Sequence, residues 1–86
     1  MGIPGLSINK QGLTVYPNPA VQTLIIEADA LEYNSAIINN VLGKEVMTIT
    51  LSGTSTNVDV SELQQGVYFL EVGSGNKREV RMFVKL

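Results

Sequence analysis

The stretch Val15-Tyr16-Pro17-Asn18-Pro19-Ala20 sets where the folded part of this chain begins. A short apolar run, Leu13 to Tyr16, leads directly into two prolines that are one residue apart. Each proline fixes its φ at about −65° and removes a backbone donor, and it disfavours the helical region for the residue before it. We therefore predict a strand that ends at Tyr16, followed by a rigid, extended crossing.

The composition excludes several classes of function. A chain of 86 residues forms one domain and buries roughly 60–65% of its unfolded surface. It has no cysteine and no histidine, so disulfides, Cys-based metal sites and the common acid–base and nucleophilic arrangements are absent. The net charge of −2 gives no reason to expect nucleic acid as a partner. The apolar runs all fall short of the ~18 residues that cross a bilayer.

Residues 1–12 have the composition of a linker or lead-in, with four glycine or proline residues and little periodicity. They lack the basic region and apolar stretch of a signal peptide. Met1-Gly2 suggests an added start, so we expect the chain to be a fragment of a longer protein. We assign residues 1–12 to this lead-in and residues 13–86 to one domain.

From Leu13 onward, short β-type runs recur every 8–12 residues, which is typical of an all-β sandwich or barrel. The seven predicted strands are Leu13–Tyr16, Thr23–Ala28, Ser35–Asn40, Glu45–Leu51, Thr56–Asp59, Val67–Val72 and Glu79–Lys85.

Alternation predicts the buried face of most strands. The inward sets are Leu24, Ile26 and Ala28; Ala36 and Ile38; Tyr68, Leu70 and Val72; and Val80, Met82 and Val84. In the last strand this assignment turns Arg81 and Lys85 outward. In the fourth strand, either Val46, Thr48 and Thr50 or Met47, Ile49 and Leu51 face the core.

Glycine-containing turns join two pairs of strands. Gly43, in the stretch Asn40–Lys44, can adopt a positive φ and predicts a hairpin. Gly73-Ser74-Gly75-Asn76 predicts a second hairpin. Between strands five and six, Ser61-Glu62-Leu63-Gln64 fits a capping box, with Gly66 as a C-terminal cap. We therefore predict one short helical turn whose buried side chain is Leu63.

The spacing Leu63-x-x-Gly66-x-Tyr68 matches the tyrosine corner of Greek-key sandwiches. In that device a tyrosine hydroxyl bonds to the backbone a few residues upstream. The alternative is a half-buried tyrosine without this bond.

Two carboxylate pairs, Asp29 with Glu32 and Asp59 with Glu62, are the remaining candidates for catalysis. We interpret both as turn and cap features, because acidic residues favour such positions. A calcium site is disfavoured, since no Asp-x-Asp-x-Asp-Gly loop is present. We therefore predict no enzyme activity, no catalytic or metal-binding residues and no cofactor.

The last strand holds four of the six basic residues, namely Lys77, Arg78, Arg81 and Lys85. Such charges occur on edge strands, where they block pairing with other sheets. A recognition surface is the alternative interpretation.

Five motifs in this order resemble the type A C-terminal sorting domain of the type IX, or Por, secretion system of Bacteroidetes-type bacteria. They are Tyr16-Pro17-Asn18-Pro19-Ala20, Leu24-Ile25-Ile26, Asn40-Val41-Leu42-Gly43-Lys44-Glu45-Val46, Val58-Asp59-Val60-Ser61-x-Leu63-x-x-Gly66-Val67-Tyr68 and Met82-Phe83-Val84-Lys85. The resemblance covers residues 13–86 and implies an immunoglobulin-like Greek-key β-sandwich of about seven strands.

The resemblance also implies a function. Such a domain is the C-terminal secretion signal of a larger exported protein, whose cargo domain precedes it. Its partners are the type IX outer-membrane translocon and a sortase-like peptidase, which removes the domain during attachment of the cargo to the cell surface. The protein is then periplasmic in transit and afterwards lies on the outer-membrane surface or outside the cell.

Carried over by position, the resemblance implies a set of recognition residues and a cleavage region. The recognition residues are Tyr16, Pro17, Asn18, Pro19, Gly43, Gly66, Tyr68, Phe83, Val84 and Lys85. The cut falls upstream, within residues 3–12. One position departs from the pattern: Asn39 stands where the family often has an aromatic residue.

Other functions stay open at this point. An adhesion or carbohydrate-binding accessory module would display exposed aromatics, for which Tyr33, Phe69 and Phe83 are the candidates. A passive spacer domain is a third possibility. The terminal edge strand can support a weak homodimer, and we expect no nucleic acid or small-molecule substrate as a partner.

Overall fold

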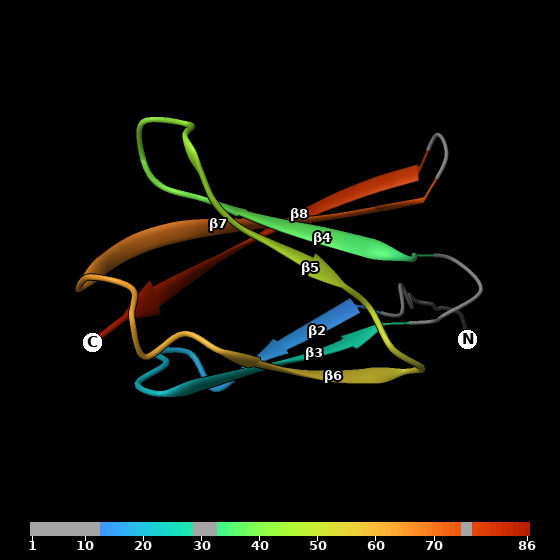
Figure 1. Ribbon diagram of the computed structural model, residues 1–86, viewed down its shortest axis with the longest axis horizontal. Coiled ribbons are helices and arrows are strands. Elements are labelled where there is room, and N and C mark those ends of the chain that lie inside the picture. The colour runs from blue at the N-terminus through green and yellow to red at the C-terminus, as the bar shows by residue number, and fades with distance from the viewer. Residues whose placement is uncertain (1–12, 29–32, 75–76) are drawn as a thin grey trace, which may run out of the picture.

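The chain folds into two antiparallel sheets packed face to face (Figure 1). The computed structural model describes residues 13–28, 33–74 and 77–86. One sheet has the strand order β2-β3-β6, formed by Leu13–Tyr16, Thr23–Ala28 and Ser55–Asp59. The other has the order β5-β4-β7-β8, formed by Glu45–Thr50, Ser35–Asn39, Gly66–Ser74 and Lys77–Lys85. The predicted all-β sandwich is confirmed, with seven strands among the described residues.

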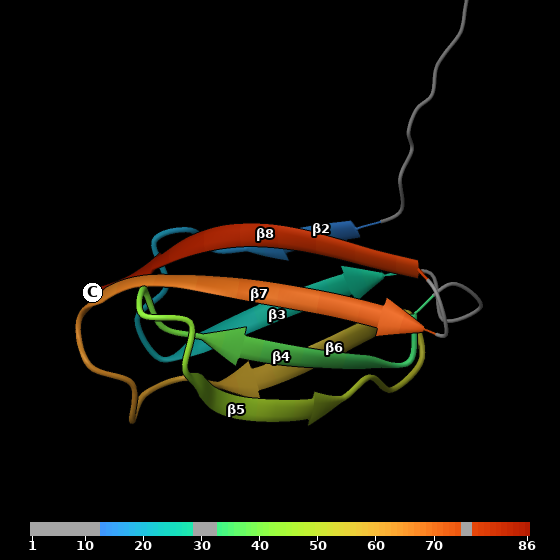
Figure 2. The same cartoon turned by 90° about the horizontal axis from the view of Figure 1, so that it is seen from above.

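The two sheets are interwoven, because β3 pairs with β6 and β4 pairs with β7. These partners are not consecutive in the chain, so the backbone passes between the sheets in the Greek-key manner. The remaining neighbours are antiparallel hairpin partners, including β7 with β8. Seen from above, the four-stranded sheet lies over the three-stranded one (Figure 2). The β7–β8 hairpin is longer than predicted, since its pairing continues to Ser74 and Lys77; its tip, residues 75–76, lies outside the described residues.

The core lies between the two sheets and consists of the side chains that alternation predicts, with one exception. The predicted sets on β3, β4 and β7 are all buried. On β5 the open choice is decided, because Met47 and Ile49 pack against the core while Val46 is exposed. The largest fully buried side chains are Phe83, Leu24, Ile26, Ile38, Leu70, Val60 and Val72.

The exception is β8, whose predicted face is reversed. Val80 and Met82 are more than half exposed, whereas Phe83 and Lys85 are buried. The register explains this result: Phe83 pairs with Tyr68, which faces inward, and the two rings stack with their centroids 5.6 Å apart. A shift of one residue in register would turn every side chain of the strand over. Arg81 and Lys85 therefore lie on the inner side of the strand, contrary to prediction.

The predicted helical turn is also wrong: the described residues contain no helix, and so none that could span a membrane. The segment after β6 instead makes one turn, in which the Leu63 N–H donates to the Val60 carbonyl at 3.0 Å. Asp59 Oδ1 accepts bonds from both the N–H (2.9 Å) and the hydroxyl (2.6 Å) of Ser61. The Ser61 hydroxyl thus serves Asp59 and not a capping box. Leu63 is only half-buried, packed against the core.

Two glycines have specific backbone roles. Gly43 has a φ of +83° in the turn between β4 and β5, as predicted for that hairpin. There Asn40 Oδ1 accepts from the N–H groups of Leu42 and Lys44, which fixes the turn. Gly66 does not cap a helix: it is the first residue of β7, with a φ of +154° that side-chain-bearing residues rarely adopt.

Candidate functional site

The free edge of β8 is occupied by the segment that follows β2. Asn18 Oδ1 accepts a hydrogen bond from the Val84 N–H at 2.9 Å, and Asn18 Nδ2 donates to the Met82 carbonyl at 3.3 Å. The two ends of these bonds are 66 and 64 residues apart in the chain. A single amide side chain therefore does what a neighbouring strand would do, because it offers one acceptor and one donor in line with the strand edge.

Ala20 continues this pairing with its backbone. Its N–H donates to the Val84 carbonyl and its carbonyl accepts from the Leu86 N–H, both at 2.8 Å, which forms a parallel bridge to Lys85. The Ala20 side chain is fully buried. The strand does end at Tyr16, as predicted, but residues 17–20 are not an extended crossing. The chain bends at residues 17–19 and lies against β8, held there by Asn18 and Ala20.

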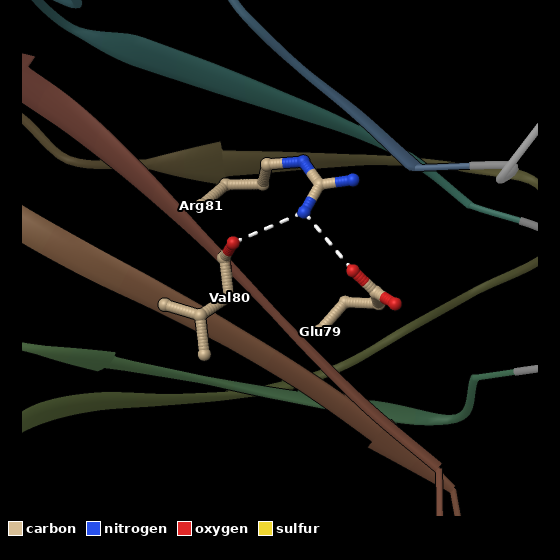
Figure 3. A network of polar contacts seen from close by, with 3 residues as sticks. All are labelled: Glu79, Val80 and Arg81. Carbon is tan, nitrogen blue, oxygen red and sulfur yellow. Dashed lines mark hydrogen bonds and ion pairs between the residues drawn. The ribbon is translucent and has the colours of Figure 1, made fainter. Parts of the chain in front are cut away.

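Arg81 covers the next part of the same edge. Its Nη1 donates to the Val80 carbonyl at 3.0 Å and lies 3.1 Å from Glu79 Oε1 (Figure 3). Together with Asn18 and Ala20, this side chain occupies edge groups that would otherwise be free to pair with another sheet. The basic residues of β8 thus favour the edge-strand interpretation over a basic recognition surface, because Arg78 bonds to Glu71 and Lys85 is buried.

Tyr68 forms the predicted corner. Its hydroxyl donates to the Gln64 carbonyl at 2.7 Å, four residues upstream. The ring stacks on Phe83, so the corner that starts β7 also supports β8 from the inside. Gly66 joins the same region, since it pairs with Lys85.

The structure brings most of the sequence-predicted recognition residues together at the C-terminal end of β8. Asn18 lies along its edge, and Gly66 and Tyr68 on β7 pair with Lys85 and Phe83. Gly43 is in the separate β4–β5 turn. Tyr16 points elsewhere: its hydroxyl bonds to Glu27 Oε2 at 2.8 Å, and this bond raises the pKa of Tyr16.

The structure places two residues of the terminal motif, Phe83 and Lys85, inside the domain. Phe83 is fully buried and Lys85 nearly so, while Val84 is half-buried. Lys85 Nζ donates to the main-chain oxygen of Leu86 at 2.9 Å. Two of the three predicted signal side chains are therefore inside the folded domain, where a partner that binds the intact surface does not reach them.

Among the carboxylate candidates that the structure describes, Asp59 has a structural role. The bonds from the Ser61 hydroxyl and N–H lower the pKa of Asp59, which is the behaviour of a turn-capping carboxylate. The pair Asp29 and Glu32 lies outside the described residues. Within the described ranges no three His, Cys, Asp or Glu side chains gather to hold a metal.

The aromatic candidates do not form an exposed row. Tyr33 and Phe83 are buried, and Phe69 alone of the three reaches solvent. The geometry expected of a carbohydrate-binding module is therefore not found among them.

Sequence reasoning missed the roles of Ala20 and Arg81. Ala20 acts through its backbone, and Arg81 through a bond to the carbonyl of its own neighbour, Val80. The sequence does single out Asn18, because its amide lies between two prolines. The partners of its hydrogen bonds could not be inferred from spacing.

A known protein-family model matches most of the chain. The model described as "Secretion system C-terminal sorting domain" covers residues 14–85. The comparison with curated proteins gave no match. The family match begins within β2 and ends with the last residue of β8, so it spans all the strands that the structure describes. The chain belongs to the secretion system C-terminal sorting domain family, the sorting signal of the Por (type IX) secretion system.

Proposed function

We propose that this domain is the cleavable sorting signal of a larger exported protein. Proteins of the Por route are exported to the cell surface or outside the cell, and the sorting domain is a signal module that the secretion machinery recognises. The finer steps are our proposal: the type IX outer-membrane translocon engages the folded domain, and a sortase-like peptidase then cuts within residues 3–12. The cargo precedes the domain in the chain.

The observation that supports this proposal most is the junction of the opening and terminal motifs. Asn18 and Ala20, near the start of the family match, hold Val84 and Leu86, near its end. A receptor that contacts this junction senses both ends of the domain at once. It therefore distinguishes a complete, folded domain from a truncated or unfolded chain.

The residues proposed for recognition then act in two ways. Pro17, Asn18 and Pro19 are exposed beside β8 and are available to a partner. Phe83 and Lys85 are buried and act by holding β8 in place. A homodimer through the β8 edge is disfavoured by this arrangement, because residues 18–20 already occupy its C-terminal part.

The test is an export assay with residues 1–86 fused behind a periplasmic reporter, in a host that carries the type IX machinery. We expect the reporter to reach the cell surface or the medium. Deletion of Met82–Leu86 removes half of the junction and should leave the reporter in the periplasm. Unchanged export after this deletion, or a periplasmic reporter with the intact domain, contradicts the proposal.

A further inference from the structure

The outer faces of the two sheets differ in chemistry. On the three-stranded sheet, the outward side chains are mostly polar, among them Thr14, Thr23, Glu27, Asn57 and Asp59. On the four-stranded sheet, β7 and β8 turn five apolar side chains outward. We name them the outer apolar face: Val67, Phe69, Val80, Met82 and Val84.

The register makes these five side chains neighbours. Phe69 pairs with Met82 and Val67 with Val84, so both rows of side chains stand on the same side of adjacent strands. Phe69 is 36% exposed and Met82 55%. In the view from above, no described strand or turn passes over β7 and β8 on this side (Figure 2). Contiguous exposed apolar side chains of this kind mark interaction sites.

The size of the face indicates what kind of contact it makes. The face is small, because only Val80 and Met82 of its five side chains are more than half exposed. Even the largest apolar patch of a typical monomer measures roughly 300–600 Å², whereas a stable interface needs roughly 800 Å² on each partner. A permanent dimer through this face alone is therefore disfavoured. A transient contact fits better, because the machinery must first bind and then release the exported protein.

The charges at the border of the face limit the chemistry of the partner. Arg78 lies on the same side of β8 and is held by Glu71 of β7, so this end of the face carries a neutralised pair. Glu71 and Arg78 neutralise each other. The centre of the face, at Phe69 and Met82, carries no charged group. The matching partner surface is aliphatic or aromatic and of low charge.

We propose that the outer apolar face is the docking surface by which the secretion machinery holds this domain, through an apolar, weakly charged protein surface. This inference rests on the proposed function and places the recognition surface on the outer side of β7 and β8. The secretion machinery then contacts the outer side of the terminal strand, at Met82 and Val84. Phe83 and Lys85, on the inner side, fix the register of the strand.

The experiment uses the reporter fusion with the full domain and two matched double variants. Phe69→Lys/Met82→Lys places two unpaired cations in the centre of the face, where docking would bury them at high cost. Thr23→Lys/Asn57→Lys adds the same charge to exposed positions on the other sheet. Thermal unfolding of the purified domains selects variants that fold like the parent; if the first pair does not, Phe69→Thr/Met82→Thr replaces it.

We expect the first pair to lower the exported fraction at least about tenfold, the change that ~1.4 kcal/mol of binding free energy gives, and the second pair to leave it unchanged. Export that survives the first pair but is lost when the whole domain is deleted overturns the docking face and leaves the proposed function standing. Export that survives deletion of the domain overturns both. An equal loss with the two pairs shows a general charge effect and overturns the docking face.

The mass of the purified domain in solution tests the choice of occupant. We expect a monomer with and without Phe69→Lys/Met82→Lys. A parent dimer that the substitutions dissociate would assign the face to a second copy of the chain and overturn a docking surface for the machinery.

Discussion

The inner side of β8 packs into the sandwich, whereas its outer side is largely open to solvent. Phe83 on the inner side is fully buried and stacks on Tyr68, and its neighbour Met82 is 55% exposed. These two adjacent residues belong to one terminal motif, yet they have different tasks. The comparison teaches that a single sequence motif can combine positions that build the core with positions that stay accessible at the surface.

The largest effect that tests this comparison is on stability. Phe83→Ala leaves a cavity between the sheets and should lower the free energy of unfolding by about 3–5 kcal/mol. Met82→Ala, one residue away, should change it by only about 0.5 kcal/mol, as surface substitutions do. Urea denaturation of the two variants measures both values. Equal losses would show that the two sides of β8 are not distinct.

A smaller effect is expected at the corner that supports the inner side. Tyr68→Phe keeps the ring against Phe83 but removes the bond from the hydroxyl to the Gln64 carbonyl. We expect a loss of about 1 kcal/mol, the net contribution of one hydrogen bond. Tyr16→Phe is the matched control, because its hydroxyl bonds to Glu27 on the exposed surface. If the control costs as much as Tyr68→Phe, the corner has no special role.

How far the sequence predicts this structure differs between the two sides of β8. Period-two alternation predicts the buried faces of β3, β4 and β7 correctly, because in those strands one face is clearly more apolar. It fails on β8, where Val80, Met82 and Val84 form the more apolar row and nevertheless face outward. Only the pairing of Phe83 with Tyr68 decides the orientation, and pairing is a long-range property that no local pattern contains.

The candidate site shows the same limit. Tyr68 could be predicted as a corner because its bond is local, four residues long. The helical turn was predicted from Ser61 and Gln64, but Asp59 two residues earlier competes for the Ser61 hydroxyl. The bonds of Asn18 to β8 join residues more than sixty positions apart, so the sequence identified the segment without its target.

The smallest predicted effect concerns pH and lies on the sheet opposite to β8. The bonds from Ser61 lower the pKa of Asp59 in the folded state. The resulting stabilisation is present above the pKa of Asp59 in the unfolded chain and is lost as the pH falls through its folded value. Asp59→Asn keeps an acceptor oxygen but cannot titrate.

Urea midpoints measured against pH should therefore differ most between parent and Asp59→Asn near neutrality and converge in acid. The effect is small, since the carboxylate is fully exposed and screened by water. Curves that stay parallel down to low pH would show that the ionised carboxylate of Asp59 does not stabilise the folded state.

The central claim is that the segment after β2 holds the edge of the terminal strand, and amide hydrogen exchange at Val84 tests it most directly. The Val84 N–H points away from β7 and has Asn18 Oδ1 as its partner. The Val80 N–H points to the same side by the alternation of an antiparallel pair, and the described residues supply it with no acceptor. We predict slow exchange at Val84 and fast exchange at Val80 in the parent, and fast exchange at both in Asn18→Ala. Fast exchange at Val84 in the parent would contradict the claim.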